Sequence, residues 1–119
     1  MAISINSTTA CALPGVGACS RLVFDTDADG ELVAAQGVGK TIEVLGVVIG
    51  GTSGITGCAI DDDTGKSIIG PFSLSNLLNI TLLPREGLVY GVTADNDALN
   101  VNIVGTGTVY GTVWYRVVG

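Results

Sequence analysis

The clearest strand patterns in this chain are Ala98-Leu99-Asn100-Val101-Asn102-Ile103-Val104 and the run that follows it, Thr108-Val109-Tyr110-Gly111-Thr112-Val113-Trp114-Tyr115-Arg116-Val117-Val118. In the first stretch, apolar residues alternate with asparagines, which is the period of a strand with one wet face. The second stretch predicts a strand with two distinct faces. One face carries Val109, Val113, Tyr115 and Val117, and the other carries Tyr110, Thr112, Trp114, Arg116 and Val118.

The composition extends this pattern to the whole chain. Of its 119 residues, 37 are Val, Ile or Thr, whereas Glu, Lys, Gln, Arg and Met together number only 10. β-Branched side chains suit a pleated strand and crowd a helix, so the balance predicts an all-β protein. The length fits one domain, and the 47% apolar content excludes a disordered chain.

Short apolar runs separated by Gly, Pro, Asn and Asp turns predict an antiparallel β-sandwich, with a jelly roll as the leading arrangement. The predicted strands are Arg21–Phe24, Glu31–Ala35, Lys40–Ile49, Ile55–Asp61, Lys66–Ile69, Asn79–Leu83, Leu88–Val92, Ala98–Val104 and Thr108–Val118. Residues 1–19 show no sustained period. We expect them to form an extended N-terminal arm, followed by one sandwich domain at residues 20–119.

The strand Lys40–Ile49 departs from alternation, because apolar residues occupy both of its faces. In an antiparallel sandwich one face of a strand meets the core and the other commonly meets water. The second apolar face therefore predicts a covering partner, and self-association is the simplest explanation. The residues expected at this subunit interface are Val44, Leu45, Val47, Val48, Ile49, Tyr110 and Trp114.

Several function classes are disfavoured by what the chain lacks. There is no histidine, the commonest general base, and no catalytic arrangement of Ser, Asp and Lys is recognised in the sequence. Neither a catalytic site nor a cofactor is therefore predicted. A net charge of −6 with only five basic residues argues against nucleic acid or anionic lipid as a partner. The uncharged runs are too short and too polar for a membrane helix. No secretion signal is recognised at the start of the chain.

The three cysteines, Cys11, Cys19 and Cys58, make an odd number, which disfavours a secreted disulfide framework. We predict three reduced thiols that serve as small hydrophobic residues. The alternative is that Cys11 and Cys19 close a small loop under oxidising conditions. A metal site is not predicted, because three scattered cysteines without histidine do not give tetrahedral spacing.

The segment Ala34–Thr41 fits a loose phosphate-binding loop, but the sequence after it is strand-like where that loop requires a helix. Lys40 is therefore interpreted as a solvated residue at the entrance of a strand.

The segment Asp25–Gly30 places oxygens at alternate positions before a glycine, as the first half of a calcium loop does. Its candidate metal ligands are Asp25, Asp27 and Asp29. No bidentate carboxylate follows at the twelfth position, so an acidic turn is the simpler interpretation. The run Asp61-Asp62-Asp63 is interpreted as a hairpin tip kept soluble by its charge.

A set of segments in fixed order resembles a family of small β-sandwich proteins encoded by tailed bacteriophages. The segments are Lys40–Ile49, Gly70–Leu74, Leu82–Pro84, Asp97–Asn102 and Gly111–Val118, within a region that covers about two-thirds of the chain. The resemblance implies a jelly-roll cement protein that decorates the capsid as a homotrimer. Such a protein binds the major capsid protein of the same phage on the outside of the virion and stabilises the shell across capsomer joints. It would be made in the cytoplasm of the bacterial host.

In that case the arm is expected to contact the shell through Ile3, Ile5, Leu13 and Pro14. Two other functions stay open. A fibre-tip or receptor-binding module would bind host glycans through exposed aromatic residues: Tyr90, Tyr110 and Trp114. A calcium-dependent lectin would depend on the Asp25–Gly30 loop.

Overall fold

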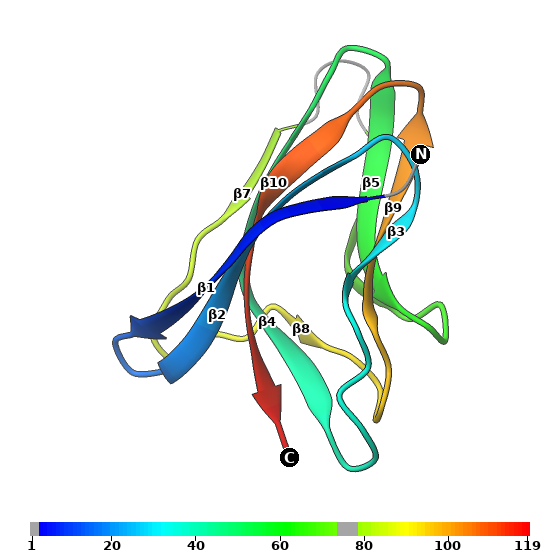
Figure 1. Ribbon diagram of the computed structural model, residues 1–119. Coiled ribbons are helices and arrows are strands. Elements are labelled where there is room, and N and C mark those ends of the chain that lie inside the picture. The colour runs from blue at the N-terminus through cyan, green and yellow to red at the C-terminus, as the bar shows by residue number, and fades with distance from the viewer. Residues whose placement is uncertain (1–2, 74–78) are drawn as a thin grey trace.

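A computed structural model describes residues 3–73 and 79–119, and in them the chain forms ten strands in two sheets (Figure 1). The strands are β1 (Ser4–Leu13), β2 (Gly17–Thr26), β3 (Gly30–Val33), β4 (Thr41–Gly51), β5 (Ile55–Asp62), β6 (Ser67–Ser73), β7 (Asn79–Leu82), β8 (Gly91–Val92), β9 (Leu99–Gly105) and β10 (Val109–Val118). The predicted all-β class with antiparallel sheets is confirmed. Residues 1–2 of the predicted arm and Leu74 of the Gly70–Leu74 segment lie outside the described residues.

The two sheets share one hydrophobic core. The larger sheet has the order β1-β2-β10-β4-β7, with β8 also paired to β4, and the smaller has the order β3-β9-β5-β6. Fully buried side chains come from both sheets, among them Phe24, Ile42 and Ile49 from the larger and Ile60 and Leu99 from the smaller. The radius of gyration is 13.5 Å, as expected for a compact chain of this length. None of the described segments is a helix that could span a membrane.

The strand pairs are nested around the turn that follows β5. The innermost pair is β5 with β6, then β4 with β7 and β8, then β3 with β9, and outermost β2 with β10. From β2 to β10, the chain therefore runs as one long antiparallel double strand whose successive pairs alternate between the two sheets. The predicted jelly roll stays a prediction.

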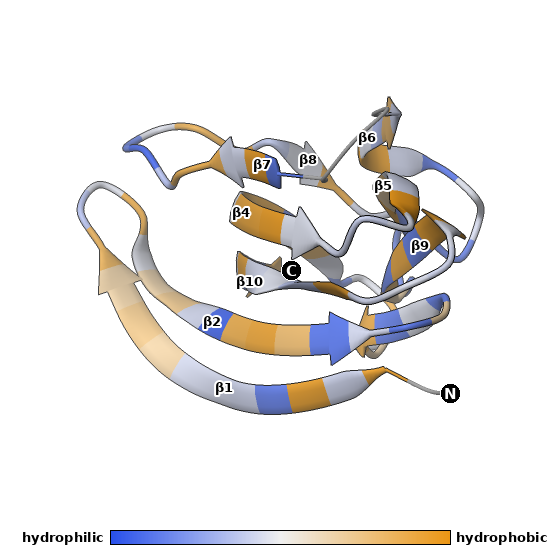
Figure 2. Ribbon diagram, turned by 90° about the horizontal axis from the view of Figure 1, so that it is seen from above, coloured by the Kyte–Doolittle hydropathy of each residue, from blue (hydrophilic) through white to orange (hydrophobic). Residues whose placement is uncertain are grey.

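The extended N-terminal arm expected at residues 1–19 is not confirmed. Residues 4–13 form β1 and residues 17–19 begin β2, and Ser7 to Leu13 pair in unbroken register with Val23 to Gly17. Figure 2 shows β1 as the outermost strand, curving along β2. Alternation is missing from its sequence because the side chains of Ile5 to Ala10 are all exposed, so neither face of β1 needs to be apolar.

The two-sided apolar character of residues 40–49 has a cause within the chain for every residue except Val48, and the prediction that a partner covers Val44, Leu45, Val47 and Ile49 is wrong. Val44, Val47 and Ile49 belong to the core between the sheets. An irregularity in the β4–β10 register places Leu45 as an extra residue, between Val44, which pairs with Tyr115, and Gly46, which pairs with Trp114. Such a bulge reverses which positions face the core. Leu45 is only 1% exposed in the single chain.

The end of β7 and the segment that follows it lie close to the middle of β4. A Cβ atom at Gly46 would lie 2.7 Å from Cδ of Pro84 and 2.8 Å from the carbonyl oxygen of Leu82. Gly46 therefore permits a close approach that any side chain would obstruct.

Candidate functional site

The outer face of the six-stranded sheet carries an ordered array of side chains from four strands. Cross-strand register places Val23, Thr112, Val48 and Thr81 in one row, and Asp25, Tyr110, Gly50 and Asn79 in the next. A third row holds Arg21, Trp114 and Gly46. Residues that alternate with the core positions of their strands must face outward, so the array follows directly from the strand period.

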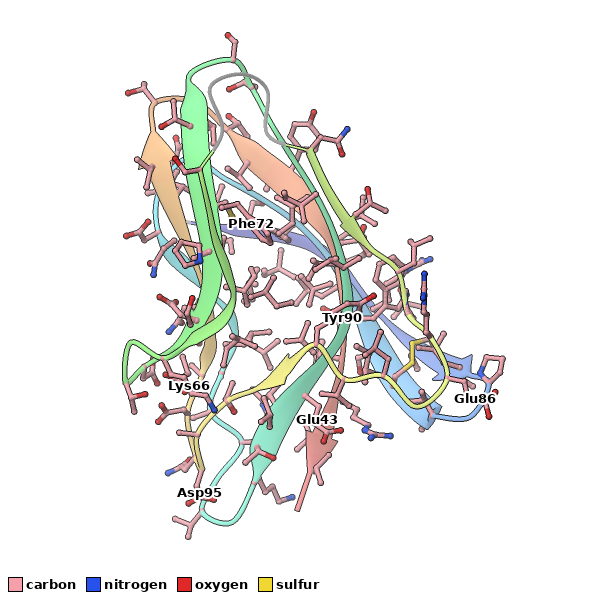
Figure 3. The ribbon with its side chains drawn as sticks, turned by 180° about the vertical axis from the view of Figure 1, so that it is seen from behind. Glu43, Lys66, Phe72, Glu86, Tyr90 and Asp95 are labelled. Atoms are coloured by element: carbon pink, nitrogen blue, oxygen red, sulfur yellow. A yellow bond between two sulfur atoms is a disulfide. The ribbon has the colours of Figure 1, made fainter. Side chains whose placement is uncertain are left out.

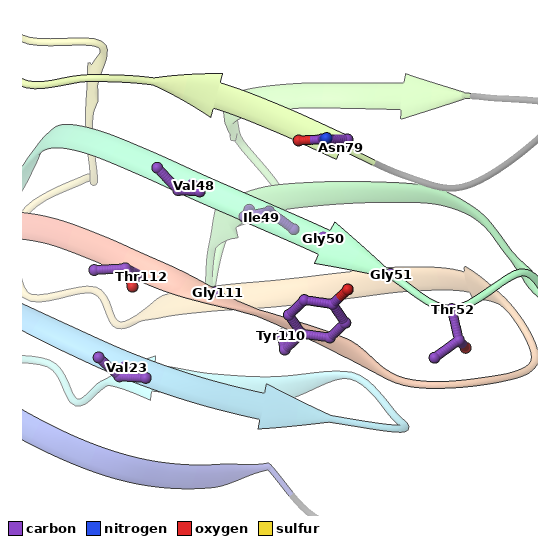
Figure 4. A pocket seen from close by; sticks show the side chains of 10 residues that line it. All are labelled: Val23, Val48, Ile49, Gly50, Gly51, Thr52, Asn79, Tyr110, Gly111 and Thr112. Atoms are coloured by element: carbon purple, nitrogen blue, oxygen red, sulfur yellow. The ribbon is translucent and has the colours of Figure 1, made fainter.

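A shallow hollow of about 670 Å³ lies within this outer face (Figure 4). Tyr110, which is 50% exposed, borders it, and its ring lies across Gly50 of the neighbouring strand. A Cβ at Gly50 would be only 2.9 Å from Cε2 of this ring, so the glycine provides the space for it. The lining residues are Val23, Val48, Ile49, Gly50, Gly51, Thr52, Asn79, Tyr110, Gly111 and Thr112.

The tip of the β1–β2 hairpin is fixed to the body of the sandwich. Arg116 of β10 forms an ion pair with Glu43 of β4, with Nε 2.6 Å from Oε1, and its Nη1 donates a hydrogen bond of 3.2 Å to the carbonyl oxygen of Val16. Figure 3 shows Glu86 at this hairpin tip, and its side chain fills the space beside Gly15. The hairpin is thus held at its turn as well as along β2.

A disulfide between Cys11 and Cys19 joins β1 and β2 near that turn, so the prediction of three reduced thiols is wrong for these two residues. The hairpin brings Cys11 directly opposite Cys19, with a Cα–Cα distance of 5.1 Å. This lies within the range that a disulfide requires. The prediction failed because the sequence shows no strand pattern that would place the two cysteines as cross-strand partners.

Cys58 is a buried free thiol on β5, where the sequence predicted a strand residue. Burial, together with the nearby charges of Asp29 and Asp61, raises the pKa of Cys58 to about 11. A thiol with this pKa remains protonated at neutral pH and is a poor nucleophile or metal ligand.

The outer face of the smaller sheet is acidic and rich in amides. Asn100 donates a hydrogen bond of 2.9 Å to Asp63, and Asn102 donates one to Asp61. The backbone N–H of Ile103 donates to Asp29 at 2.8 Å. The prediction that Asn100 and Asn102 share the wet face of their strand is supported by these partners.

The interpretation of Asp61-Asp62-Asp63 as a solvated hairpin tip is wrong for Asp62, which is only 3% exposed. Its Oδ1 accepts hydrogen bonds from the N–H and hydroxyl of Thr64 and the N–H of Lys66, and its Oδ2 accepts one from the N–H of Ala94. Burial acts to raise the pKa of Asp62, but these hydrogen bonds outweigh it and the net shift is downward. Asp62 thus fixes the β5–β6 turn to the segment before β9.

Neighbouring carboxyls respond differently to this environment. Burial raises the pKa of Asp61, and the adjacent charges of Asp62 and Asp29 add to the shift. Hydrogen bonds from Asn100 and Ala98 lower the pKa of Asp63.

The candidate calcium ligands Asp25, Asp27 and Asp29 are not brought together. Asp25 accepts a hydrogen bond of 3.0 Å from the amide of Asn6, while Asp29 accepts the one from Ile103. Among the described residues, no three acidic, His or Cys side chains converge as a metal ion would require. The buried hydroxyl of Thr26 donates a hydrogen bond to the carbonyl oxygen of Ala28, which helps to close the turn.

The predicted interface residues divide into two groups. Val44, Leu45, Val47 and Ile49 are buried within the single chain, so the prediction that they form a subunit interface is wrong. The structure brings the remaining three together on the outer face of the larger sheet: Val48, Tyr110 and Trp114.

The predicted shell-contact residues and glycan-binding aromatic residues also differ in their exposure. Ile3 packs against the core, whereas Ile5 is 41% exposed, and Leu13 and Pro14 border a small cavity of about 150 Å³ beside Pro84 to Glu86. Tyr90 packs on the core beside β4, and its hydroxyl donates to the carbonyl oxygen of Leu83, so its ring is not a free surface for a sugar (Figure 3). As predicted, Lys40 is exposed immediately before a strand, and no helix follows it.

Comparisons of the chain with protein-family models, with curated proteins and with solved structures find no match.

Proposed function

We propose that this chain is a bacteriophage structural protein that decorates the outside of the capsid as a homotrimer and stabilises the shell across capsomer joints. The observation that carries the proposal is the nesting of the strand pairs. A jelly roll is a long antiparallel hairpin rolled so that successive pairs alternate between two sheets, and the nested pairs support this proposed arrangement. This is the architecture that the resemblance to phage cement proteins implies.

The outer face of the larger sheet is the surface we assign to trimer contacts. It presents Tyr110, Trp114 and Val48 on a rigid sheet, and aromatic residues with few charges are typical of the centre of an interface. Because Tyr110 and Trp114 lie on one strand, a neighbouring subunit can cover both without rearrangement of the backbone.

The disulfide and the charge agree with a position on the outside of a particle. Disulfides persist at virion surfaces and are rare in the cytoplasm, so Cys11 and Cys19 would be oxidised after release from the host cell. A net charge of −6 disfavours binding to the packaged DNA.

A second candidate function, glycan binding by a fibre-tip module, is favoured by one observation. The hollow combines one exposed aromatic ring, that of Tyr110, with the hydroxyl of Thr112 and the amide of Asn79. An aromatic surface bordered by a few polar groups is the usual composition of a small-ligand site.

The two functions are separated by substitution of one residue. In light scattering coupled to size exclusion, the full chain should have a mass that is a multiple of three times 12.0 kDa. Tyr110→Ser should reduce this mass by disrupting the outer-face contact, whereas the control Val104→Ser, at an exposed apolar residue of the other sheet, should not. A mass that is unchanged by Tyr110→Ser, together with loss of binding on a glycan array, would establish the alternative and overturn the trimer contact.

A further inference from the structure

The four edges of the two sheets are not equally protected against pairing with another chain. β3 and β7 have only four residues each, β3 carries the charge of Glu31, and β6 contains Pro71, which has no N–H to donate. Short strands, charges and prolines are the usual means by which sheet edges avoid association. Among the described edges, β1 alone is long and has none of these features.

The backbone of β1 is available over most of its length. It is the terminal strand of its sheet and pairs with β2 on one side (Figure 2). In an antiparallel pair, every second residue directs its N–H and C=O away from the partner strand. The regular segment from Ser7 to Leu13 therefore presents a row of such groups along roughly 23 Å, at about 3.3 Å per residue.

The chemistry of this segment suits an identical strand. Ser4 to Leu13 contains no charged residue in a chain of net charge −6, so two copies can approach without like charges facing each other. The side chains from Ser7 to Ala10 are small and exposed, and they leave both faces open. The charged register partners of β1 on β2 are Arg21 and Asp25, one of each sign.

The β1 edge is also rigid before it pairs with another chain. The Cys11–Cys19 disulfide and the contact of Arg116 with Val16 fix the hairpin, so little backbone freedom remains to be lost on association. This matters because β1 buries few of its own side chains and would otherwise be ordered by its pairing with β2 alone.

We propose that the β1 edge is a homotypic interface, at which β1 of a second copy of this chain pairs antiparallel to form a continuous sheet across two molecules. A second copy is the occupant because it supplies the same long, uncharged edge, and an antiparallel pair about a two-fold axis satisfies both edges at once. In the proposed capsid function, on which this placement rests, the contact would join neighbouring trimers across the surface of the shell.

The test compares the full chain with a double variant, Thr8→Lys with Thr9→Lys, which places positive charge on both faces of the exposed edge. Thr8 and Thr9 are exposed, so the fold should be kept, as circular dichroism would verify. The control is Val38→Lys with Ser53→Lys, which adds the same charge at two exposed loop residues away from β1. Light scattering should show that the mass of the edge variant is at most half that of the wild type, while the control keeps the wild-type mass.

Amide hydrogen exchange gives an independent measurement. Alternate amides from Ser7 to Leu13 that point away from β2 should be protected in the wild type and exchange at least tenfold faster in the edge variant. Equal masses and equal exchange for both proteins would overturn the proposal. A wild-type dimer that becomes a monomer in the edge variant would support the β1 interface and overturn the trimer. A wild-type trimer whose mass is unchanged by Thr8→Lys with Thr9→Lys would support the trimer contact and overturn the β1 interface.

Discussion

Replacement of Asp62 should destabilise the protein more than replacement of any exposed carboxylate. In Asp62→Ala, the N–H groups of Thr64, Lys66 and Ala94 lose an ionised acceptor that is only 3% exposed. A hydrogen bond to a charged group contributes about 1.5–3 kcal/mol, and water can solvate part of a turn once the carboxylate is gone. We therefore expect the free energy of unfolding to fall by about 3–4 kcal/mol.

Asp62→Asn should cost less, about 2 kcal/mol, because its amide oxygen can replace one carboxylate oxygen but its NH₂ group would face the N–H of Ala94. Asp95→Asn removes the same charge from an exposed turn and serves as the control, with no measurable change expected. Urea unfolding followed by circular dichroism measures all three variants. A loss below about 1 kcal/mol for Asp62→Ala would refute the role assigned to these hydrogen bonds.

The effect should depend on pH in a defined direction. The pKa of Asp62 is lowered in the folded state, so its contribution is present above the unfolded pKa of about 3.9 and is lost as the pH falls through the lower folded value. The stability difference between wild type and Asp62→Asn should therefore shrink as the pH is lowered below about 4. Because the charge of Asp62 raises the pKa of Asp61, an NMR titration of Asp61 in Asp62→Asn should show a lower pKa than in the wild type. A stability difference between wild type and Asp62→Asn that is constant from pH 7 to pH 3 would contradict the coupling of stability to the ionisation of Asp62.

Three further outcomes can be measured on the same protein. Cys11→Ser with Cys19→Ser opens a disulfide with a sequence separation of 8 and should lower the free energy of unfolding by about 2–3 kcal/mol, which calorimetry under non-reducing conditions would detect. No change in Tm would mean that the hairpin is fixed without the disulfide. Gly46→Ala should lower the free energy of unfolding by about 1–3 kcal/mol, because the added Cβ would meet Pro84 and the carbonyl oxygen of Leu82. A variant as stable as the wild type would show that residues 83–84 do not pack closely against β4. Cys58, buried with a pKa of about 11, should resist thiol reagents at pH 8 until urea unfolds the chain, and rapid labelling of the native protein would contradict its burial.

Part of the outer face could be derived from the sequence because a strand has a fixed period. The alternation in residues 108–118 placed Val109 and Val113 on one face and Tyr110 on the other, and the structure buries the two valines and leaves Tyr110 exposed. The asparagines of residues 98–104 were assigned to a wet face by the same reasoning. Each of these predictions needs only local backbone geometry and one buried side of a sheet.

The wrong predictions concern residues whose environment is set by distant segments. Leu45 is covered within its own chain, and a bulge in the β4–β10 register changes which positions of β4 face the core. Asp62 is buried because Ala94, 32 residues later, donates to its carboxylate. The sequence around either residue contains no sign of these partners.

Strand propensity and alternation are local properties, so the all-β class, the nine strands from β2 to β10 and the faces of the last two could be predicted without knowledge of the fold. Tertiary structure alone decided that β1 exists, that Cys11 meets Cys19, and which apolar residues stay exposed. The physical reason is that an edge strand with exposed side chains is specified by backbone hydrogen bonds to its neighbour. Those hydrogen bonds do not require any alternating pattern of side chains in the sequence.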